Sequence, residues 1–294
     1  MKVSILASVY NEEKTLKPFL DGVFSQTIPS GVEVELLVCN DASTDESGDI
    51  LNQALYEERD LSLRVIHNTT NVGQAVSINR LFKIAKGSIV VFIDGDAIAQ
   101  KNWLMNLIEP VLSGRAEIVQ GNYWTQYGAR TLVVSEHEKW RRSASLRRFG
   151  NTDETVRTVN TRNFAIAADL LREVHERFGY ILNPHATCGA DTELGLFLSG
   201  SGHKIVLKED AVVAHDDPAT LRGILRQKMH HGFHDGLLGI SYPNNMYYAV
   251  YYPFIHDRVS LFFSIPVALA FTLANSTGLL LRALRPNRAM GSIA

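Results

Sequence analysis

The sequence is poor in cysteine and in net charge, and each shortage excludes a class of protein. It holds two cysteines, Cys39 and Cys188, among 294 residues. Two cysteines build no dense disulfide framework, and no CxxC or Cys/His pair has metal-ligand spacing, which favours a reducing compartment. The 29 Lys and Arg residues nearly balance 31 Asp and Glu residues, for a formal charge of −2. We therefore expect no nucleic-acid partner, because such a partner calls for excess positive charge.

The chain is rich in hydrophobic residues, which make up 46% of it, and its length favours two domains. Its first 120 residues repeat a short Val-, Ile- and Leu-rich run followed by a stretch with helical spacing. This alternation is typical of a parallel α/β sheet with both faces covered. We interpret the opening run as a strand, because polar residues follow it too soon for a secretory signal. The expected strands are 3–9, 32–39, 63–67, 88–93 and 117–120, and the expected helices are 13–24, 45–58, 73–85 and 103–112.

Beyond residue 121 the alternation loosens. We expect an insertion or an acceptor half over 122–235, with a last strand pair near 204–215 and a helix over 219–231. The stretch 136–151 is basic, and it is either a solvated loop or a surface that faces anionic headgroups or a carrier phosphate.

The C-terminal part is different again, because 259–281 contains no Asp, Glu, Lys, Arg or His. This length exceeds the roughly 20 residues needed to cross the core of a bilayer. Pro266 and Asn275 interrupt the stretch, and arginines flank it on both sides, so no orientation follows. A tilted span, a re-entrant pair of half-helices, an interfacial helix, and a buried core helix or dimer contact all remain open.

Polar residues follow three of the predicted strands, where ligands bind in open α/β sheets. The first strand ends before Tyr10, Asn11 and Glu12, and the second ends before Asp41. The fourth is followed by Asp94-Gly95-Asp96, whose carboxylates at i and i+2 project to the same side of an extended segment. Oxygen ligands of this kind suit Mg²⁺ or Mn²⁺ together with a substrate phosphate. We expect all three clusters to face one pocket.

Each cluster also has a plain structural interpretation. An Asp-Gly-Asp triplet makes ordinary turns, and the residues after Asp41 can cap the next helix. Asp41 itself comes directly off its strand, where its carboxylate can accept hydrogen bonds from a base or from ribose hydroxyls. Gly73, near the start of a helix, either offers backbone N–H groups to a phosphate or simply begins the helix.

Further acids and imidazoles occur in the second half of the chain. Asp191 and Glu193 precede an apolar helical run, either as a general base with its neighbour or as charges favoured at a helix N-terminus. His215 follows an apolar strand and is a candidate metal ligand or a turn residue. His230 and His234 share a helix face. With no third ligand at a recognisable spacing, we favour a solvated or phosphate-facing helix there over a metal site.

Together, these motifs resemble those of the family 2 inverting glycosyltransferases, which have the GT-A fold. The resemblance spans about residues 1–235 and rests on the segments SILASVYNEE, VCNDASTDES, NVGQAVSINRLFKIAKGSIVVFIDGDA, TRNFAIAADLLREV and CGADTELGLFLSGSGHKI. It implies a mostly parallel α/β sheet sandwiched by helices, to which the apolar C-terminal tail is added. It also implies a nucleotide-sugar-binding domain over 1–235, with a donor half over 1–121, followed by a membrane-associating or oligomerising tail over 236–294.

The resemblance assigns roles to particular residues. Tyr10 would lie against the base, Asp41 would hydrogen-bond it, and Asp94 would contact the ribose or the cation. Asp96 would ligate Mn²⁺ or Mg²⁺, and Asp191 would be the catalytic base. His215 matches a strand-end histidine that reaches the metal or the diphosphate. The expected donor-binding set is Tyr10, Asn11, Glu12, Asp41, Gly73 and Asp94.

The chain departs from the family's pattern at three places. Ala7 or Ser8 stands where members have Pro in the first strand. Ala190-Asp191 stands where the motif reads Glu-Asp, which leaves Asp191 to carry the base role alone. His230 occupies a position where Arg is usual, so processive polymerisation is not supported.

The expected activity is transfer of a sugar from a UDP- or GDP-sugar, with inversion, to a hydroxyl on a lipid-linked or cell-envelope glycan. Membrane contact through 259–281 would place the protein on the cytoplasmic face of the cell membrane, and a homodimer is possible. Two alternatives stay open. A sugar nucleotidyltransferase usually has a Gly-rich basic loop after its first strand, which here is acidic, and a silent binding protein would lack acids that this chain retains.

Overall fold

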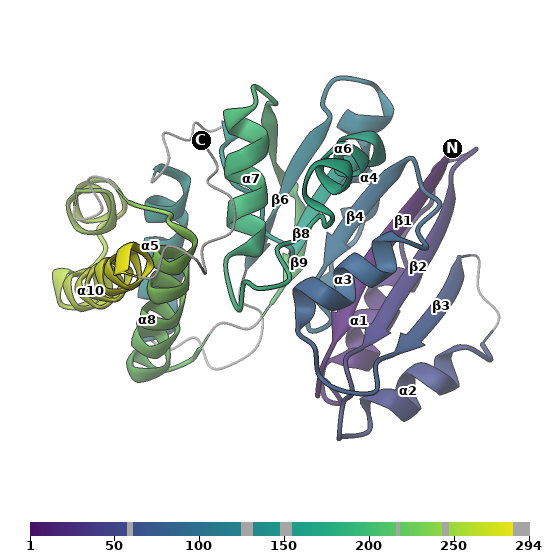
Figure 1. Cartoon of the computed structure of the whole chain (residues 1–294), viewed down its shortest axis with the longest axis horizontal. Coiled ribbons are helices and arrows are strands. Elements are labelled where there is room, and N and C mark those ends of the chain that lie inside the picture. Colours follow the sequence, from purple (N-terminus) through teal and green to yellow (C-terminus); the bar gives the residue numbers. More distant parts are fainter. Residues whose placement is uncertain (58–60, 125–131, 148–154, 216–217, 243–246, 285–294) are drawn as a thin grey trace. The chain divides into compact units, whose positions relative to one another are not determined.

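The structure, a computed structural model, describes residues 1–57, 61–124, 132–147, 155–215, 218–242 and 247–284 (Figure 1). Internal contacts divide the chain into two compact units. The first comprises Met1–Trp124, Val159–His185 and Ser201–His215, and the second comprises Thr125–Thr158, Ala186–Gly200 and Asp216–Ala294. The segments of these two units alternate along the chain. The division into consecutive domains over 1–235 and 236–294 stays a prediction.

The first unit is built on a mixed sheet with the strand order β3-β2-β1-β4-β8-β6-β9-β5. Strands β3, β2, β1 and β4 run parallel to one another. Their apolar runs match the predicted strands to within one residue at each end. Their bounds are β1 (Lys2–Val9), β2 (Glu33–Asn40), β3 (Ser62–His67) and β4 (Ile89–Ile93).

The other half of this sheet brings in antiparallel pairs. Strand β8 pairs antiparallel with both β4 and β6, and β5 pairs antiparallel with β9. The predicted strand pair near 204–215 is wrong: β9 is one ten-residue strand, because a register shift at Gly121/Asn122 lets β6 pair with both of its ends. The bounds are β5 (Ile98–Ala99), β6 (Ile118–Trp124), β7 (Thr155–Val156), β8 (Asn163–Ala167) and β9 (Ile205–Ala214).

Helices cover both faces of the sheet (Figure 1). On one face, the alternate apolar side chains of β1, β2 and β4 form a core with α1 (Leu16–Phe24), α2 (Ser47–Ala54) and α4 (Trp103–Leu112). On the other face lie α3 (Gln74–Phe82) and α6 (Ala168–Phe178). The predicted α/β sheet sandwiched by helices is therefore confirmed.

Asn163 joins the two halves of the sheet. Its buried side chain accepts a hydrogen bond from Trp103 Nε1 at 2.7 Å and donates to the carbonyls of Asn122 at 2.6 Å and Ala211 at 2.8 Å. A Cβ on Gly121 would collide with its amide. This junction fixes the start of β8 beside the end of β4, where the site described below begins.

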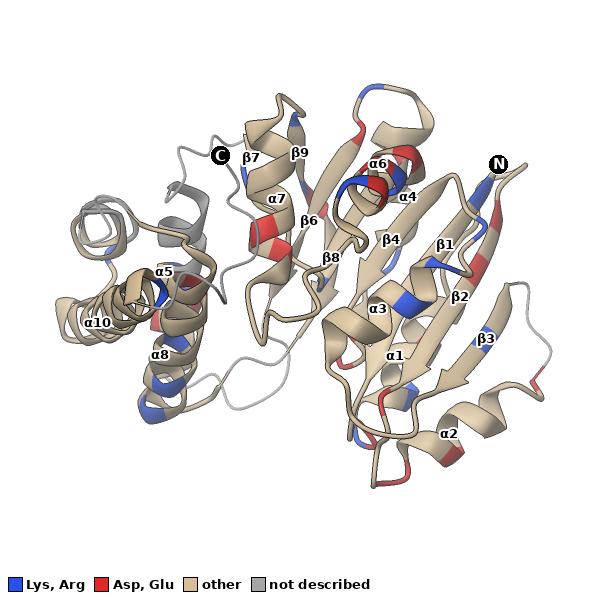
Figure 2. Ribbon diagram, in the orientation of Figure 1, with Lys and Arg blue, Asp and Glu red and all other residues tan. Residues whose placement is uncertain are grey.

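The second unit is helical and has a core of its own. The elements are α5 (Leu132–Arg147), α7 (Ala190–Gly200), α8 (Leu221–Leu238), the π-helix η1 (Tyr247–Tyr251), α9 (Tyr252–Asp257) and α10 (Leu261–Leu284). Trp140, Ile224 and Phe263 are among the buried side chains that pack together. By length and composition alone, α10 could cross a membrane. In Figure 2 most of α10 is uncoloured, whereas α8 carries several positive residues.

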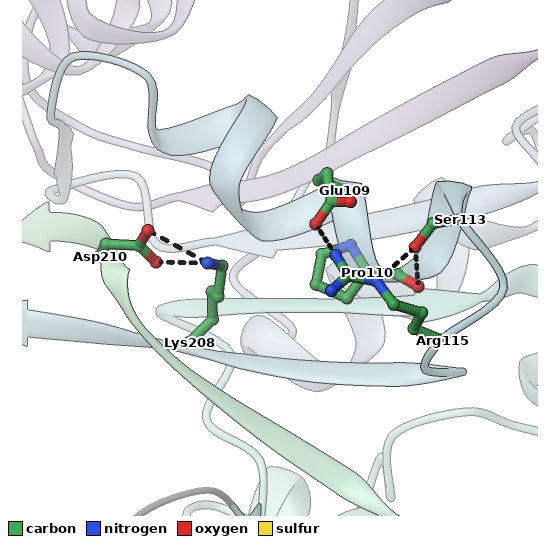
Figure 3. A network of polar contacts seen from close by, with 6 residues as sticks. All are labelled: Glu109, Pro110, Ser113, Arg115, Lys208 and Asp210. Atoms are coloured by element: carbon green, nitrogen blue, oxygen red, sulfur yellow. Dashed lines mark hydrogen bonds and ion pairs between the residues drawn. The ribbon is translucent and has the colours of Figure 1, made fainter.

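The outer edge of the first unit carries surface ion pairs (Figure 3). Arg115 contacts Glu109 and donates from Nε to Ser113 Oγ at 2.9 Å, just past the end of α4. Lys208 contacts Asp210 at 3.1 Å on β9. Exposed pairs of this kind contribute about 0–1 kcal/mol each to stability, so the buried core carries the fold.

Candidate active site

The carboxyl ends of β1, β2 and β4 open onto one cavity of about 330 Å³ in the first unit. The sequence placed acids after these strands, and the structure brings them together because the three strands are parallel neighbours. The residues that line this cavity are Ser8, Tyr10, Glu12, Asp41, Asn71, Gly73, Gln74, Asp94, Gly95 and Asp96.

Asp41 anchors one wall of the cavity. Its carboxylate is buried and accepts hydrogen bonds from Asn68 Nδ2 at 2.7 Å, Val72 N at 3.0 Å and Gly73 N at 2.8 Å. Arg80 in turn donates to Asn68 Oδ1. Asp41 therefore holds the loop before α3 in place, which is a larger structural role than a helix cap.

Gly73 lies where the sequence predicts it, at the start of α3 and in the cavity wall. Its φ of +90° is in the region that favours glycine. The N–H expected to meet a phosphate is instead donated to Asp41 in this structure. Its role in donor binding stays a prediction.

The two acids after β4 meet a histidine from the end of β9. Three possible ligand atoms, one from each of Asp94, Asp96 and His215, lie within 4.8 Å of one another. His215 Nε2 is 3.2 Å from Asp96 Oδ2. Gly95 permits this turn, since a Cβ there would lie 2.8 Å from the Ser8 carbonyl oxygen.

One arginine and one amide contact Asp94. Arg162 Nε lies 3.6 Å from Asp94 Oδ2, and Gln74 Nε2 donates to Asp94 Oδ1 at 2.6 Å. Burial raises the pKa of Asp96, but the hydrogen bond and charge of His215 and the charge of Arg162 outweigh it, so the net pKa lies below its ordinary value. Asp96 is therefore ionised at neutral pH.

Glu12 lies near Asp96, and its pKa is shifted in the opposite direction. Burial and then the charge of Asp96 raise the pKa of Glu12, although Thr15 Oγ1 donates to its carboxylate at 2.9 Å. Two carboxylates and an imidazole are ligands for a divalent cation. His215 Nε2 is the ring nitrogen that faces Asp96, and it is the atom that would reach a cation here. The residues present therefore fit Mn²⁺ or Mg²⁺.

Tyr10 and Asn11 follow β1 but lie differently. Tyr10 lines the cavity and is 45% exposed. Asn11 does not line the cavity: its Oδ1 accepts from Thr44 N at 2.8 Å, and its own N–H donates to Ser43 Oγ at 3.0 Å. Its positive φ of 58° aims it at this neighbouring loop. Its predicted contact with the donor stays a prediction.

Asp191 belongs to the second unit, in the first turn of α7. Its Oδ1 accepts from Thr192 N at 2.8 Å. Gly189, which precedes the helix with φ +81°, lies against the buried carboxylate of Asp235. Asp191 thus sits in the first turn of a helix, and its role as base stays a prediction.

Sequence reasoning missed Gln74, Arg162 and Asn68. Arg162 directly precedes β8. The start of β8 lies beside the end of β4 because the two strands are antiparallel. A sequence shows this only once the direction of the strand is known. His230 and His234 have ring centroids 4.4 Å apart, yet among the described residues they are not part of a metal-binding group of three. The arginines 141, 142, 147 and 148 of the basic stretch lie outside the described side chains.

Comparison with known proteins agrees with this geometry. GlyG of Streptococcus pneumoniae is 30% identical over 122 residues, 42% of this chain and 39% of GlyG. The UDP-Glc:α-D-GlcNAc-diphosphoundecaprenol β-1,3-glucosyltransferase WfaP of Escherichia coli is 29% identical over 124 residues, 42% of this chain and 47% of WfaP. The aligned stretches thus span less than half of these curated relatives.

A solved structure and a family model cover more of the chain. The mannosyltransferase PcManGT of Pyrobaculum calidifontis, in complex with GDP-Man and Mn²⁺, superimposes with a TM-score of 0.58 at 20% identity, over 99% of this chain and 76% of PcManGT. At this identity the likeness shows the GT-A type fold. The model of glycosyl transferase family 2 matches residues 4–174, more than half of the chain. The chain therefore belongs to glycosyltransferase family 2.

Proposed function

We propose that the chain is an inverting, metal-dependent glycosyltransferase that moves a sugar from a nucleoside diphosphate sugar to a hydroxyl acceptor. The observation that carries the proposal is the group of Asp94, Asp96 and His215 at the edge of a cavity that also contains Asp41. The solved relative PcManGT was crystallised with GDP-Man and Mn²⁺, which supports a donor and a cation of this class.

The cavity offers separate contacts for the base and the diphosphate. A carboxylate has about four lone-pair sites, and Asp41 uses three of them within the protein, which leaves one on Oδ2 for a donor group of the base. Tyr10 would lie against the base. A bound divalent cation would be held by Asp96 and His215 and would neutralise charge on the departing diphosphate.

Asp191 would take the proton from the acceptor hydroxyl as it attacks. Attack opposite the leaving group inverts the anomeric centre. The base must be ionised to accept this proton, and Asp191 would supply its carboxylate from the first turn of α7.

The acceptor is proposed as a lipid-linked or cell-envelope glycan reached from the cytoplasmic face of the membrane. WfaP, by its name, acts on a sugar linked to diphosphoundecaprenol, which supports an acceptor of this class. Membrane contact through 259–281 would bring the site to such a lipid. The alternative role of residues 259–281 is to form the contact of a homodimer.

Replacing the proposed base tests the mechanism. Asp191→Asn is expected to lower sugar transfer by a factor of about 100 or more, because general base catalysis contributes that much, while donor affinity stays unchanged. The measurement is transfer and hydrolysis with a panel of UDP-, GDP- and TDP-sugars and Mn²⁺, alongside calorimetric donor binding. Glu193→Gln changes the other acid in the first turn of α7, two residues after Asp191. It is the matched control and should retain transfer.

The other outcomes separate the alternatives. Normal turnover by Asp191→Asn removes that residue from the mechanism. Donor binding without transfer or hydrolysis by the unaltered protein favours a binding protein. Formation of a nucleotide sugar from a nucleoside triphosphate and a sugar phosphate favours a nucleotidyltransferase.

A further inference from the structure

One face of α10 is apolar and exposed along its whole length. Phe262 is 93% exposed and Leu273 is 68% exposed. The spacings of three, four, four, seven and four residues between successive members put this set on one side of the helix. The exposed apolar stripe is Phe262, Ile265, Leu269, Leu273, Leu280 and Leu284. At about 1.5 Å per residue, it is roughly 33 Å long.

The opposite face of α10 is fastened to α8. A Cβ on Gly236 would collide with the Asn275 carbonyl oxygen and lie 2.8 Å from Leu279 N, so the two backbones touch. Asn275 Nδ2 donates to the carbonyls of Gly232 at 3.1 Å and Ile240 at 3.0 Å. Arg282 donates to the Leu238 carbonyl at the end of α8. Because of these contacts, we expect α8 and α10 to move as one body.

Helix α8 contains three Lys or Arg residues and one carboxylate. Arg222 and Arg226 are exposed, and Lys228 lies over the Trp140 ring at 5.3 Å. The one carboxylate in α8, Asp235, is buried and accepts a hydrogen bond from Tyr242. Helix α10 has no acidic residue at all. The α8–α10 pair therefore presents an apolar stripe and a cationic helix side by side.

We propose that α10 lies flat on the surface of an anionic bilayer, with its apolar stripe at the acyl boundary and the α8 arginines near lipid phosphates. A spanning α10 would carry Arg222 and Arg226 into the hydrocarbon core, which is unfavourable. A second copy of the chain would bring another cationic α8 close by, and like charges repel. An apolar helix face beside cations is instead the pattern of an interfacial helix.

The proposal rests on the proposed function in one respect: membrane docking would serve to reach a lipid-linked acceptor. Docking itself needs neither donor nor cation. A protein that binds vesicles but transfers no sugar would overturn the proposed function alone, and an active protein that ignores vesicles would overturn this proposal alone.

The test is co-sedimentation of the full chain with vesicles of phosphatidylcholine, with and without phosphatidylglycerol. We expect binding to the anionic vesicles, reduced by about tenfold or more in Leu269→Ser/Leu273→Ser, because both side chains belong to the exposed apolar stripe. Leu55→Ser/Tyr56→Ser removes two exposed apolar side chains outside α10 and should bind like the unaltered protein.

The charge contribution has its own variants. Arg222→Gln/Arg226→Gln is expected to lower binding to anionic vesicles by about tenfold and to leave binding to neutral vesicles unchanged. Lys17→Gln/Arg64→Gln, two exposed cations of the first unit, is the control. Equal binding to neutral and anionic vesicles would overturn the role of the arginines.

Two further results would overturn the flat arrangement. An interfacial helix is released by alkaline carbonate, so retention of the protein in carbonate-washed membranes would indicate a span. A concentration-dependent dimer that is lost in Leu269→Ser/Leu273→Ser, with no vesicle binding, would indicate that a second copy covers the stripe.

Discussion

At the scale of single residues, the buried carboxylate of Asp41 connects β2 to the loop before α3. Asp41→Asn keeps the size of the side chain but turns an NH₂ group toward a donor such as Gly73 N or Asn68 Nδ2. We expect a loss of about 1–3 kcal/mol in the free energy of unfolding, together with weaker donor binding. Urea denaturation measures the first effect and calorimetry the second. The exposed Asp49→Asn is the control, and equal stability of the two variants would contradict this role.

Glu35 is the corresponding anchor at the other end of β2. Burial raises the pKa of Glu35, but hydrogen bonds from Ser4 at 2.5 Å and Lys86 N at 2.8 Å, with Lys2 at 3.1 Å, hold the net pKa below its ordinary value of 4.5. A lowered carboxyl pKa adds stability above the unfolded pKa, and this stability is lost as pH falls through the folded pKa.

Glu35→Gln is therefore expected to cost about 1–3 kcal/mol in the free energy of unfolding near neutral pH. The difference from the unaltered protein should shrink when urea denaturation is repeated below the ordinary pKa of 4.5. Glu33→Gln, at the exposed start of the same strand, should show neither effect. A difference that stays constant with pH would mean that the ionised carboxylate is not what stabilises this end of the sheet.

At the scale of elements, the contact between α8 and α10 depends on glycine. Gly236→Ala would force the helices apart, because its Cβ has no room beside Asn275 and Leu279. We expect a loss of about 1–3 kcal/mol in the free energy of unfolding, measured by circular dichroism. Gly200→Ala in α7 has no heavy atom within 4 Å of its Cβ and should be neutral or stabilising. Equal effects of the two would argue against close packing of α8 and α10.

The elements that the sequence predicted best are the parallel strands. The run Ile89–Ile93 is apolar throughout, and all five side chains are buried, so its pattern reflects its place in the sheet. Strand β8 has a similar run, Asn163–Ala167, but neither its antiparallel direction nor its place between β4 and β6 is written in local sequence. Both depend on long-range pairing, which also explains why Arg162 went unpredicted.

Part of the candidate site was predictable for the same reason. Asp41, Asp94 and Asp96 directly follow buried parallel strands, and the ends of such strands meet at one edge. Asn11 shares that position, but its positive φ of 58° turns it toward the neighbouring loop and away from the cavity. Composition alone does not reveal a backbone angle.

At the scale of the whole molecule, the two units carry different chemistry. The first holds the donor cavity with Asp94, Asp96 and His215, and the second holds Asp191 together with the α8–α10 pair. The account therefore assigns recognition of the donor to the sheet and both deprotonation and membrane docking to the helical unit. The central claim is that Asp96 and His215, beside Asp94, hold a divalent cation that binds the donor diphosphate.

Calorimetric titration of nucleoside diphosphate sugars into the full chain tests this claim most directly. With Mn²⁺ present, we expect one donor to bind measurably and its affinity to fall by about tenfold or more with EDTA or in Asp96→Asn, because the cation neutralises the diphosphate. Asp210→Asn, an exposed acid on β9 outside the cavity, should leave the affinity unchanged. Equal donor affinity with Mn²⁺, with EDTA and in Asp96→Asn would contradict the account.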